Sequence, residues 1–234
     1  MRVGTCIRSG RRLAVAAAGA VALSLVAVAG AGAAGPDAEA GGMAGAASPG
    51  QGSGTAPRGM APAFMLDHGH FVRFEVPGSS LTFAIGLNNR EQVVGYYDDA
   101  AGATHGFLRD QRGRITTIDV PGALNSENFA INDQGQIVGT YSVQPSPPGS
   151  PGTFGPQIGF LRDARGKFTT LRFPGSIYTE AHDINNLGQV VGEWGDTAGG
   201  IHGFRWDKGR FTSIDVPGSA LATATGINDR GQIV

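Results

Sequence analysis

The sequence has few of the residues on which common catalytic and redox sites depend. Its one cysteine, Cys6, lies ahead of a long apolar run near the N-terminus. We expect export processing to remove this residue, which leaves the mature chain without a disulfide, a cysteine metal site or a cysteine nucleophile. The motifs G-x-S-x-G, H-E-x-x-H and the P-loop are also absent. The sequence therefore identifies no catalytic, cofactor-binding or metal-binding residue by motif.

Charged residues are sparse as well. They make up 16% of the chain, whereas glycine is abundant at 39 residues, a balance typical of short strands and tight turns rather than long amphipathic helices. Without the four arginines of the leader, the 18 Lys+Arg fall to 14 against 19 Asp+Glu, so the formal charge becomes −5. Because no basic run offsets this charge, the sequence argues against nucleic acid or an anionic membrane surface as a partner.

The N-terminus predicts export. A positive segment with Arg2, Arg8, Arg11 and Arg12 precedes a charge-free run of apolar and small residues that ends in A-x-A triplets. Residues 1–34 are therefore a predicted signal peptide, and the mature protein is expected outside the cell or at its surface. The run is also long enough to remain as an uncleaved membrane anchor. The adjacent arginines resemble a twin-arginine signal, but the flanking residues fit that pattern poorly, which leaves the export route open.

A spacer and a repeat domain are predicted to follow the leader. Residues 35–66 are rich in Gly, Ala, Ser and Pro and contain almost no large apolar side chain. They cannot bury enough surface to offset chain entropy, so we predict a disordered spacer. Residues 67–234 form the predicted repeat domain, in which order begins near Phe71.

One pattern, I-N-D-Q-G-Q-I-V-G-T-Y at Ile131 to Tyr141, organises this domain because it recurs three more times. Its asparagine stands at Asn88, Asn132, Asn185 and Asn228, in steps of 44, 53 and 43 residues. A self-similar unit of about 40 to 50 residues built from short strands is typical of a radial or stacked β array.

Further strand-like segments recur around this pattern. Segments such as Ile115 to Gly122 (ITTIDVPG) alternate apolar and polar residues and end in Pro-Gly, which indicates an outer strand followed by a turn. Segments such as His105 to Asp110 (HGFLRD) indicate another strand. The Asn pattern itself indicates a hairpin with a short first arm, an N-[DN]-x-G turn and a second arm that is apolar on both faces.

Two details of this hairpin lead to predictions of their own. Gly95, Gly139 and Gly192 occupy the same place in its second arm, which indicates a close approach of neighbouring backbone. The first copy has Glu91 where the other turns have glycine, so its hairpin is predicted to be the least regular.

Each period thus holds four short strands in sequence. The predicted fold is all-β, a β-propeller-like array of four-stranded blades, with three full blades and a partial one. The repeat units span about 84–122, 128–175 and 181–218, and the partial unit spans 224–234. Because the partial unit stops inside its second strand, the sequence predicts an intact product that continues beyond Val234.

These motifs resemble a known family. The combination of H-G-F-L-R-D, F-T-T-I-D-V-P-G and I-N-D-x-G-Q-I-V-G behind a secretion signal is similar to the bacterial extracellular repeats of the HAF type, named for a His-Ala-Phe triplet. That triplet reads His105-Gly106-Phe107 in the first repeat and His202-Gly203-Phe204 in the third, whereas the second repeat has Ile158 in place of histidine. The resemblance covers residues 71–234. It implies secretion and a propeller-like array, and it supplies no catalytic residue.

Several repeated residues have both a structural and a functional interpretation. His105 and His202 could be ligands or bases, but because Ile158 replaces them in one copy, we expect them to pack under a strand and bond a local carbonyl. The Asn-Asp turns could bind calcium, yet each offers two carboxylates at most, and turn formation explains them sufficiently. Three aromatics at strand ends could stack on sugars, but their equal spacing favours core packing. They are Tyr97, Tyr141 and Trp194.

Function on a repeat scaffold tends to lie where the copies differ. One set of residues with mixed acid and imidazole character meets this criterion: Glu127, Tyr178, Glu180, His182 and Asp183. They lie on the link into the first strand of repeats two and three, and their side chains are of the types that perform acid–base chemistry.

Two functions are open at this point. We favour a secreted, non-catalytic repeat protein that displays loops for binding an extracellular protein or glycan at the cell surface. The alternative is a secreted propeller enzyme, such as a lyase or glycosidase, with acids at the mouth of the channel. A purely structural array is a third possibility. An enzyme should gather at least two unrepeated acids or histidines within about 10 Å across the channel, whereas a binding module should have varied rim loops.

Overall fold

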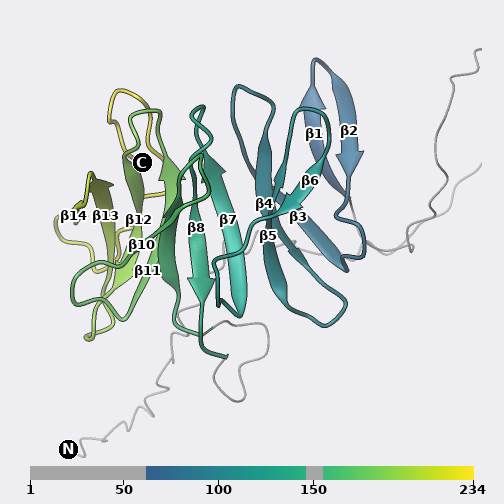
Figure 1. The fold of residues 1–234 in the computed structure, drawn as a ribbon. Helices are drawn as coiled ribbons and strands as arrows, with labels where there is room; N and C mark the ends of the chain where they lie inside the picture. The colour runs from purple at the N-terminus through teal and green to yellow at the C-terminus, as the bar shows by residue number, and fades with distance from the viewer. Residues whose placement is uncertain (1–61, 146–154) are drawn as a thin grey trace, which may run out of the picture. The chain divides into compact units, whose positions relative to one another are not determined.

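A computed structural model describes residues 62–145 and 155–234 (Figure 1). The predicted signal peptide, Cys6 and most of the predicted spacer lie outside the described residues. Every helix or strand within these two ranges is a β-strand. The same ranges contain no helix that is long and apolar enough to cross a membrane. The all-β fold class is therefore confirmed.

Three four-stranded antiparallel sheets follow one another along the chain, and in each sheet consecutive strands pair as a simple meander (Figure 1). The first sheet contains β3 (Leu81–Leu87), β4 (Val93–Asp98), β5 (Thr104–Arg109) and β6 (Ile115–Thr117). The second contains β7 (Asn125–Ile131), β8 (Ile137–Ser142), β9 (Ile158–Arg162) and β10 (Phe168–Leu171). The third contains β11 (Tyr178–Ile184), β12 (Val190–Gly195), β13 (Ile201–Asp207) and β14 (Arg210–Ile214). The predicted four-strand unit is present in all three copies.

A two-stranded sheet precedes the first meander. β1 (Ala63–Asp67) pairs antiparallel with β2 (His70–Phe74). The predicted beginning of order near Phe71 was therefore too late, and the predicted spacer 35–66 ends in a strand. The physical reason is that β1 packs Met65 into an apolar cluster, a contact that the polar and small residues before it gave no reason to expect.

The last repeat begins a further hairpin. Ile227 and Ile233 form an isolated antiparallel bridge, and the Thr225 N–H donates to the Val234 carbonyl at 2.8 Å. This hairpin packs on Val191 of the third sheet. The described sheets do not close on one another.

Apolar clusters between neighbouring sheets make up the core. Val94 of the first sheet packs with Ile131 of the second, and Val138 of the second packs with Ile184 of the third. The phenylalanine that follows each His-Gly or Ile-Gly pair is almost fully buried. These residues are Phe107, Phe160 and Phe204. Because one sheet cannot cover both of its apolar faces, each repeat depends on its neighbours for burial.

The turns led by asparagine join neighbouring sheets as well as closing their own hairpins. Asn132 Oδ1 accepts two backbone N–H groups of its own turn at 3.1 and 3.0 Å. Its Nδ2 donates to the backbone carbonyl of Asn185 in the next sheet at 3.1 Å. The same bond runs from Asn88 to Asn132 and from Asn185 to Asn228, at 3.0 Å in both cases. We refer to these inter-sheet bonds as the Asn ladder.

The first hairpin is as regular as the others, so the prediction that Glu91 would disturb it was wrong. Glu91 has φ 57°, near the 76° of Gly135. Its N–H donates to the Asn88 carbonyl at 3.1 Å, as that of Gly135 does to Asn132 at 3.0 Å. The turn imposes the left-handed conformation on whichever residue stands there, at a cost of about 1 to 2 kcal/mol for a glutamate.

The glycines of the second arm confirm the predicted close approach. At each of them a Cβ would lie 1.9 Å from a backbone carbonyl oxygen of the paired first strand, a distance that no packing can accommodate. The glycines are Gly95, Gly139 and Gly192, and the carbonyl oxygens belong to Phe83, Glu127 and Glu180 respectively.

Candidate functional site

Two buried glutamates occupy equivalent places in neighbouring sheets. Glu127 lies on β7 and Glu180 on β11, and their exposed fractions are 7% and 4%. The first repeat has Phe83 at this place. Burial, followed by the negative charges of Glu180 and Asp98, raises the pKa of Glu127 to about 8. Glu127 therefore holds a proton at neutral pH.

His182 is the closest ionisable neighbour of Glu180. The two approach at 3.5 Å between Nε2 and Oε2, and the imidazole lies edge-on to Phe129 with 6.1 Å between ring centroids. Burial raises the pKa of Glu180, against the opposing effect of His182. Burial lowers the pKa of His182, but the hydrogen bond and charge of Glu180 outweigh it, so the net shift is upward.

Glu193 extends the cluster along β12, where it pairs across the ladder with Glu180. Its two carboxylate oxygens accept hydrogen bonds from the Tyr178 hydroxyl at 3.1 Å and the Thr223 hydroxyl at 2.8 Å. Burial and the charge of Glu193 raise the pKa of Tyr178 above its ordinary range. Tyr178 is therefore a neutral donor at any physiological pH.

The structure brings together four of the five predicted residues: Glu127, Tyr178, Glu180 and His182. Asp183 has another role, because its carboxylate accepts the backbone N–H groups of Ile184 and Ile227, both at 2.8 Å, and so ties the third sheet to the hairpin that follows. Sequence reasoning missed Glu193. The signal was available, since Tyr96 and Thr140 stand at the same place in the first two repeats.

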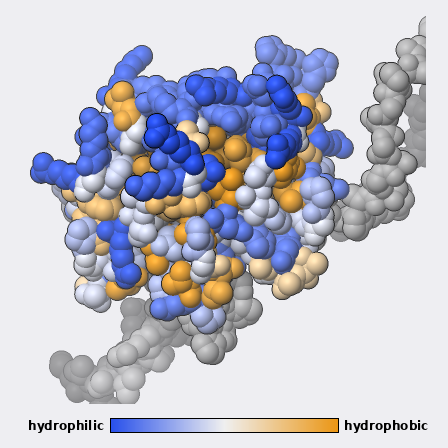
Figure 2. All heavy atoms as spheres, in the orientation of Figure 1, coloured by the Kyte–Doolittle hydropathy of each residue, from blue (hydrophilic) through white to orange (hydrophobic). Residues whose placement is uncertain are grey.

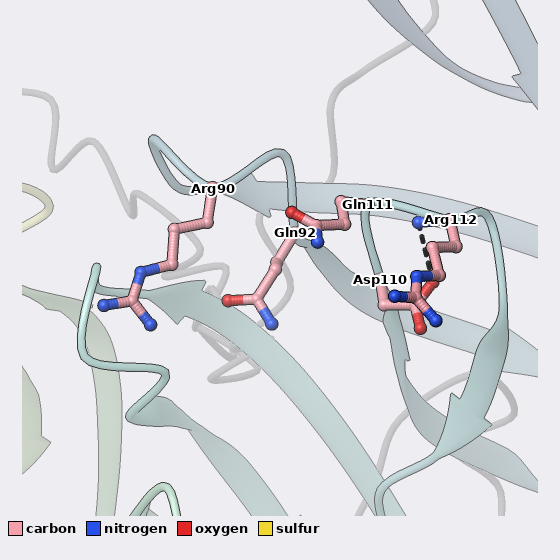
Figure 3. A pocket seen from close by; sticks show the side chains of 5 residues that line it. All are labelled: Arg90, Gln92, Asp110, Gln111 and Arg112. Atoms are coloured by element: carbon pink, nitrogen blue, oxygen red, sulfur yellow. Dashed lines mark hydrogen bonds between the residues drawn. The ribbon is translucent and has the colours of Figure 1, made fainter.

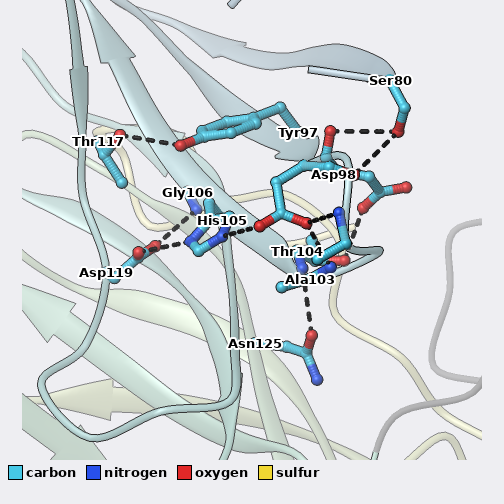
Figure 4. A network of polar contacts seen from close by, with 12 residues as sticks. Ser80, Tyr97, Asp98, Ala103, Thr104, His105, Gly106, Thr117, Asp119 and Asn125 are labelled. Atoms are coloured by element: carbon cyan, nitrogen blue, oxygen red, sulfur yellow. Dashed lines mark hydrogen bonds and ion pairs between the residues drawn. The ribbon is translucent and has the colours of Figure 1, made fainter. Parts of the chain in front are cut away.

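The repeated histidines form clamps with two aspartates each. His105 Nδ1 lies 2.8 Å from Asp119 and its Nε2 lies 3.4 Å from Asp99 (Figure 4). His202 makes the same contacts, at 2.6 Å to Asp215 and 3.2 Å to Asp196. The predicted structural role agrees with these contacts, but the partners are carboxylates rather than a local carbonyl.

The charges of these clamps follow from their hydrogen bonds. Burial lowers the pKa of His105, yet its two aspartates raise it to a net upward shift. Hydrogen bonds to Asp215 and Asp196 raise the pKa of His202. Each clamp thus favours an imidazolium between two carboxylates, held at the link between sheets.

The strand-end aromatics pack as predicted. Tyr97 stacks on His105 with 5.2 Å between ring centroids. Trp194 lies between His202 at 4.4 Å and Phe173 at 4.1 Å. Tyr141 packs against the cluster between the first and second sheets. The rings of these aromatics are therefore packed against other side chains of the protein.

The oxygens of the Asn-Asp turns are also used by the protein. The carboxylate of Asp133 accepts the backbone and side-chain N–H groups of Asn89, both at 2.9 Å, and this hydrogen bonding lowers its pKa. Asp229 accepts the backbone N–H of Asn186 at 2.8 Å in the same way. Among residues 62–145 and 155–234, no three His, Cys, Asp or Glu side chains are arranged to hold a metal ion.

Two clefts lie at this end of the sheets: one is lined by both the first-to-second and the third-to-fourth turn of the first sheet, and the other only by the hairpin β13–β14 of the third sheet. One, of about 340 Å³, is lined by Arg90, Gln92, Asp110, Gln111 and Arg112 (Figure 3). The other, of about 520 Å³, is lined by Arg205, Asp207, Lys208, Arg210 and Thr212. Both combine cationic side chains with one aspartate and with neutral hydrogen-bonding groups, and in the second cleft Arg205 donates to Asp207 at 2.8 Å.

Comparison with known proteins does not assign the chain to a family. No family model matches it, and no curated protein matches it either. Its function must therefore be argued from the geometry described above.

Proposed function

We propose that the chain is an exported, non-catalytic module of HAF-type repeats that binds a partner at the cell surface. The observation that carries this proposal is the division of the repeat into constant and variable parts. The Asn ladder recurs at each junction between sheets, the glycine contacts recur inside each sheet, and together they build a fixed frame. The surface clefts differ in lining from one repeat to another. A fixed frame with varied surface turns is how binding scaffolds are built.

We further propose that the sheets are set around a common axis, as in a β-propeller. The hairpin β1–β2 supports this arrangement because it matches β13–β14. His68 and Gly69 have φ 46° and 83°, like Lys208 and Gly209 at 48° and 92°. The match includes an edge-on phenylalanine pair at similar centroid distances, 5.6 Å in β1–β2 and 5.4 Å in β13–β14. The pairs are Phe64 with Phe71 and Phe204 with Phe211.

The hairpin before the first meander and the hairpin after the third correspond to different halves of the repeat. β1–β2 corresponds to third and fourth strands, and residues 224–234 correspond to first and second strands. Phe64, Leu66 and Phe71 are 57%, 55% and 64% exposed, although the equivalent Phe204 is buried by a neighbouring sheet. In the third sheet Val190 pairs with Trp206, and the equivalent residues are Ile233 and Leu66. An inner hairpin of the 224–234 type would complete the sheet and cover the exposed side chains.

A disulfide experiment tests this arrangement. In the full chain, Leu66→Cys combined with Ile233→Cys should form a disulfide under mild oxidation, within one molecule or between two, because the register of a completed sheet places them opposite. In the control, Met65→Cys replaces Leu66→Cys, and the side chain then points to the other face. Equal crosslinking of both pairs, or of neither, would contradict the proposed arrangement.

Export and surface binding are tested together. The tagged full chain should be recovered from culture medium or the cell surface after fractionation, with the leader removed. Purified chain labelled with a fluorophore should then bind the producing cells in a saturable way. The same incubation should release no small degradation products from the cells and leave their cell-wall polymers unaltered. Recovery in the cytoplasm, or binding that does not saturate, would overturn the proposal.

The buried cluster supports an enzyme as the second candidate. Glu127 holds its proton up to about pH 8 and lies in the field of Glu180, and paired carboxyls of this kind perform glycoside cleavage. Against it stands their burial, at 7% and 4% exposed. Assays for new reducing ends on acidic and neutral polysaccharides decide between the two. Activity that Glu127→Gln and Glu180→Gln both abolish would favour the enzyme.

A further inference from the structure

The cations of this acidic domain gather at one set of turns. In each of the three four-stranded sheets, the hairpin between the third and fourth strands carries three of them, although no run of basic residues occurs in the sequence. They are Arg109, Arg112 and Arg114 in the first sheet, Arg162, Arg165 and Lys167 in the second, and Arg205, Lys208 and Arg210 in the third. All three four-stranded sheets therefore carry a local positive charge at this hairpin.

Topology places these hairpins on one rim. In an antiparallel meander the turn between strands one and two and the turn between strands three and four lie at the same end. The Asn ladder holds the first kind of turn side by side in successive sheets. We call this end of the sheets, with both kinds of turn, the Asn rim. Strongly hydrophilic side chains cover the upper edge of the molecule in Figure 2, where the β1–β2 turn of Figure 1 also lies.

Charge is divided between the two ends of the sheets. Of the arginines and lysines in the described residues, only Arg73 and Arg172 lie outside the Asn rim. Seven acids also lie on the rim: Asp67, Glu91, Asp110, Asp133, Asp163, Asp207 and Asp229. Most other acids are toward the opposite end, among them Asp99, Asp119, Asp196, Asp215 and the buried glutamates. The rim is net positive on a domain that is net negative, a distribution that attracts anions to one end.

The rim cations are available to a ligand. Arg90, Arg112, Lys208 and Arg210 are exposed. Asp110, which lies among them, uses one carboxylate oxygen to accept the backbone N–H groups of its own turn at 2.9 Å. In the first cleft the guanidinium groups of Arg90 and Arg112 stand on either side of two glutamine amides (Figure 3). Such a cleft offers charge to a carboxylate and hydrogen bonds to hydroxyl groups.

We propose that the Asn rim binds an acidic polysaccharide, with sugar carboxylates seated in the two clefts. This inference rests on the proposed function and names its ligand class. Seven carboxylates interspersed among the cations would repel a nucleic acid, whose phosphates carry charge at every nucleotide. A polymer with sparser charges and many hydroxyls matches the alternation of cations, acids and amides along the rim. Because both clefts lie along the rim, several weak contacts can act together on one polysaccharide molecule.

The test measures binding of the full chain to polygalacturonate by affinity electrophoresis and fluorescence titration, over a range of NaCl concentrations. Arg90→Gln with Arg112→Gln, and Lys208→Gln with Arg210→Gln, should each weaken binding about tenfold. The slope of log affinity against log salt should become shallower by about one for each cation removed. All four residues are exposed, so thermal unfolding of the variants should match the unaltered chain.

A matched control uses cations outside the rim. Arg73→Gln with Arg172→Gln removes the same charge and should change the affinity less than about twofold. An equal loss in this control, equal binding to neutral dextran, or tighter binding to duplex DNA than to polygalacturonate at the same salt would overturn the inference. Saturable binding to cells that both rim variants retain, without polygalacturonate binding, would overturn this inference alone and leave the proposed function in place.

Discussion

At the Asn rim the same hydrogen bonds join each sheet to the next, whereas toward the opposite end the same strands carry different residues in each copy. Asn88, Asn132 and Asn185 make one ladder with distances that agree within 0.1 Å. On the strand that leads into each ladder asparagine, Phe83 in the first repeat is replaced by glutamates in the next two. This difference shows that the bonds between sheets at the Asn rim fix the architecture. The residues toward the opposite end of the strands can vary without disturbing it.

The largest expected effect is at the close glycine contacts of the frame. Gly139→Ala would place a Cβ 1.9 Å from the Glu127 carbonyl oxygen, so the pair β7–β8 must separate. We expect a loss of about 4 kcal/mol or more in the free energy of unfolding, measured by urea denaturation. Gly159→Ala is the control, because its nearest atom lies at 3.0 Å and a small shift relieves it. Equal losses would show that the backbone contact does not limit the fold.

The ladder itself comes next. Asn132→Ala removes the acceptor of two turn N–H groups and the inter-sheet donor at a residue that is 4% exposed. We expect a loss of about 3 kcal/mol by urea denaturation. Asn228 makes the same bonds within its own turn but is exposed, so Asn228→Ala should cost about 1 kcal/mol. If both substitutions cost the same, the inter-sheet bond would contribute nothing.

The buried cluster that contains Glu127 should make the stability of the domain depend on pH. The pKa of Glu127 is raised from 4.5 to about 8, so between these values the folded state binds more protons than the unfolded state. Stability is therefore fully present below about pH 4.5 and falls as pH rises toward 8. Glu127→Gln should remove this fall and stabilise the domain by about 2 kcal/mol at pH 9, with little change at pH 4. Parallel pH profiles of the two proteins, measured by thermal unfolding, would contradict the assignment.

The smallest expected effect concerns the one frame turn without glycine. Glu91→Gly should raise the free energy of unfolding by about 1 kcal/mol, because glycine adopts φ near 57° without steric strain. The reciprocal change, Gly135→Glu, should lower it by a similar amount, since that turn has the same hydrogen bonds. A stabilising effect of Gly135→Glu would mean that the side chain gains contacts not visible in the first repeat.

The fold was predictable where local patterns repeat. Period-two alternation, the Asn turns and the glycines at fixed places located the strands of all three meanders, because each of these patterns acts within a few residues. β1 was missed, although Asp67, Gly69 and Gly78 match Asp207, Gly209 and Gly218. Its strand has neither the histidine nor the glycine of the motif, so only the spacing to Pro-Gly could have revealed it.

The candidate site was predictable in part for a related reason. Comparing copies identified Glu127, Glu180 and His182, because a departure from a repeat is visible in sequence. Glu193 was missed since the comparison was restricted to the first strands. The sequence contains no run of basic residues, so it did not reveal the cations of the Asn rim. These cations gather at one end because the meander returns the chain to that end every two strands. Neither burial nor a pKa near 8 could be read from residue types alone.

The Asn ladder also bears on how such a protein can evolve. The turns led by Asn132 and Asn185 each offer a side-chain donor to the turn after them and a backbone acceptor to the turn before them. A unit copied or deleted between two others would therefore meet the same partner groups on both sides. Unequal recombination can change the number of units in a single step without redesigning any contact, and each new copy is then free to diverge away from its Asn-led turn.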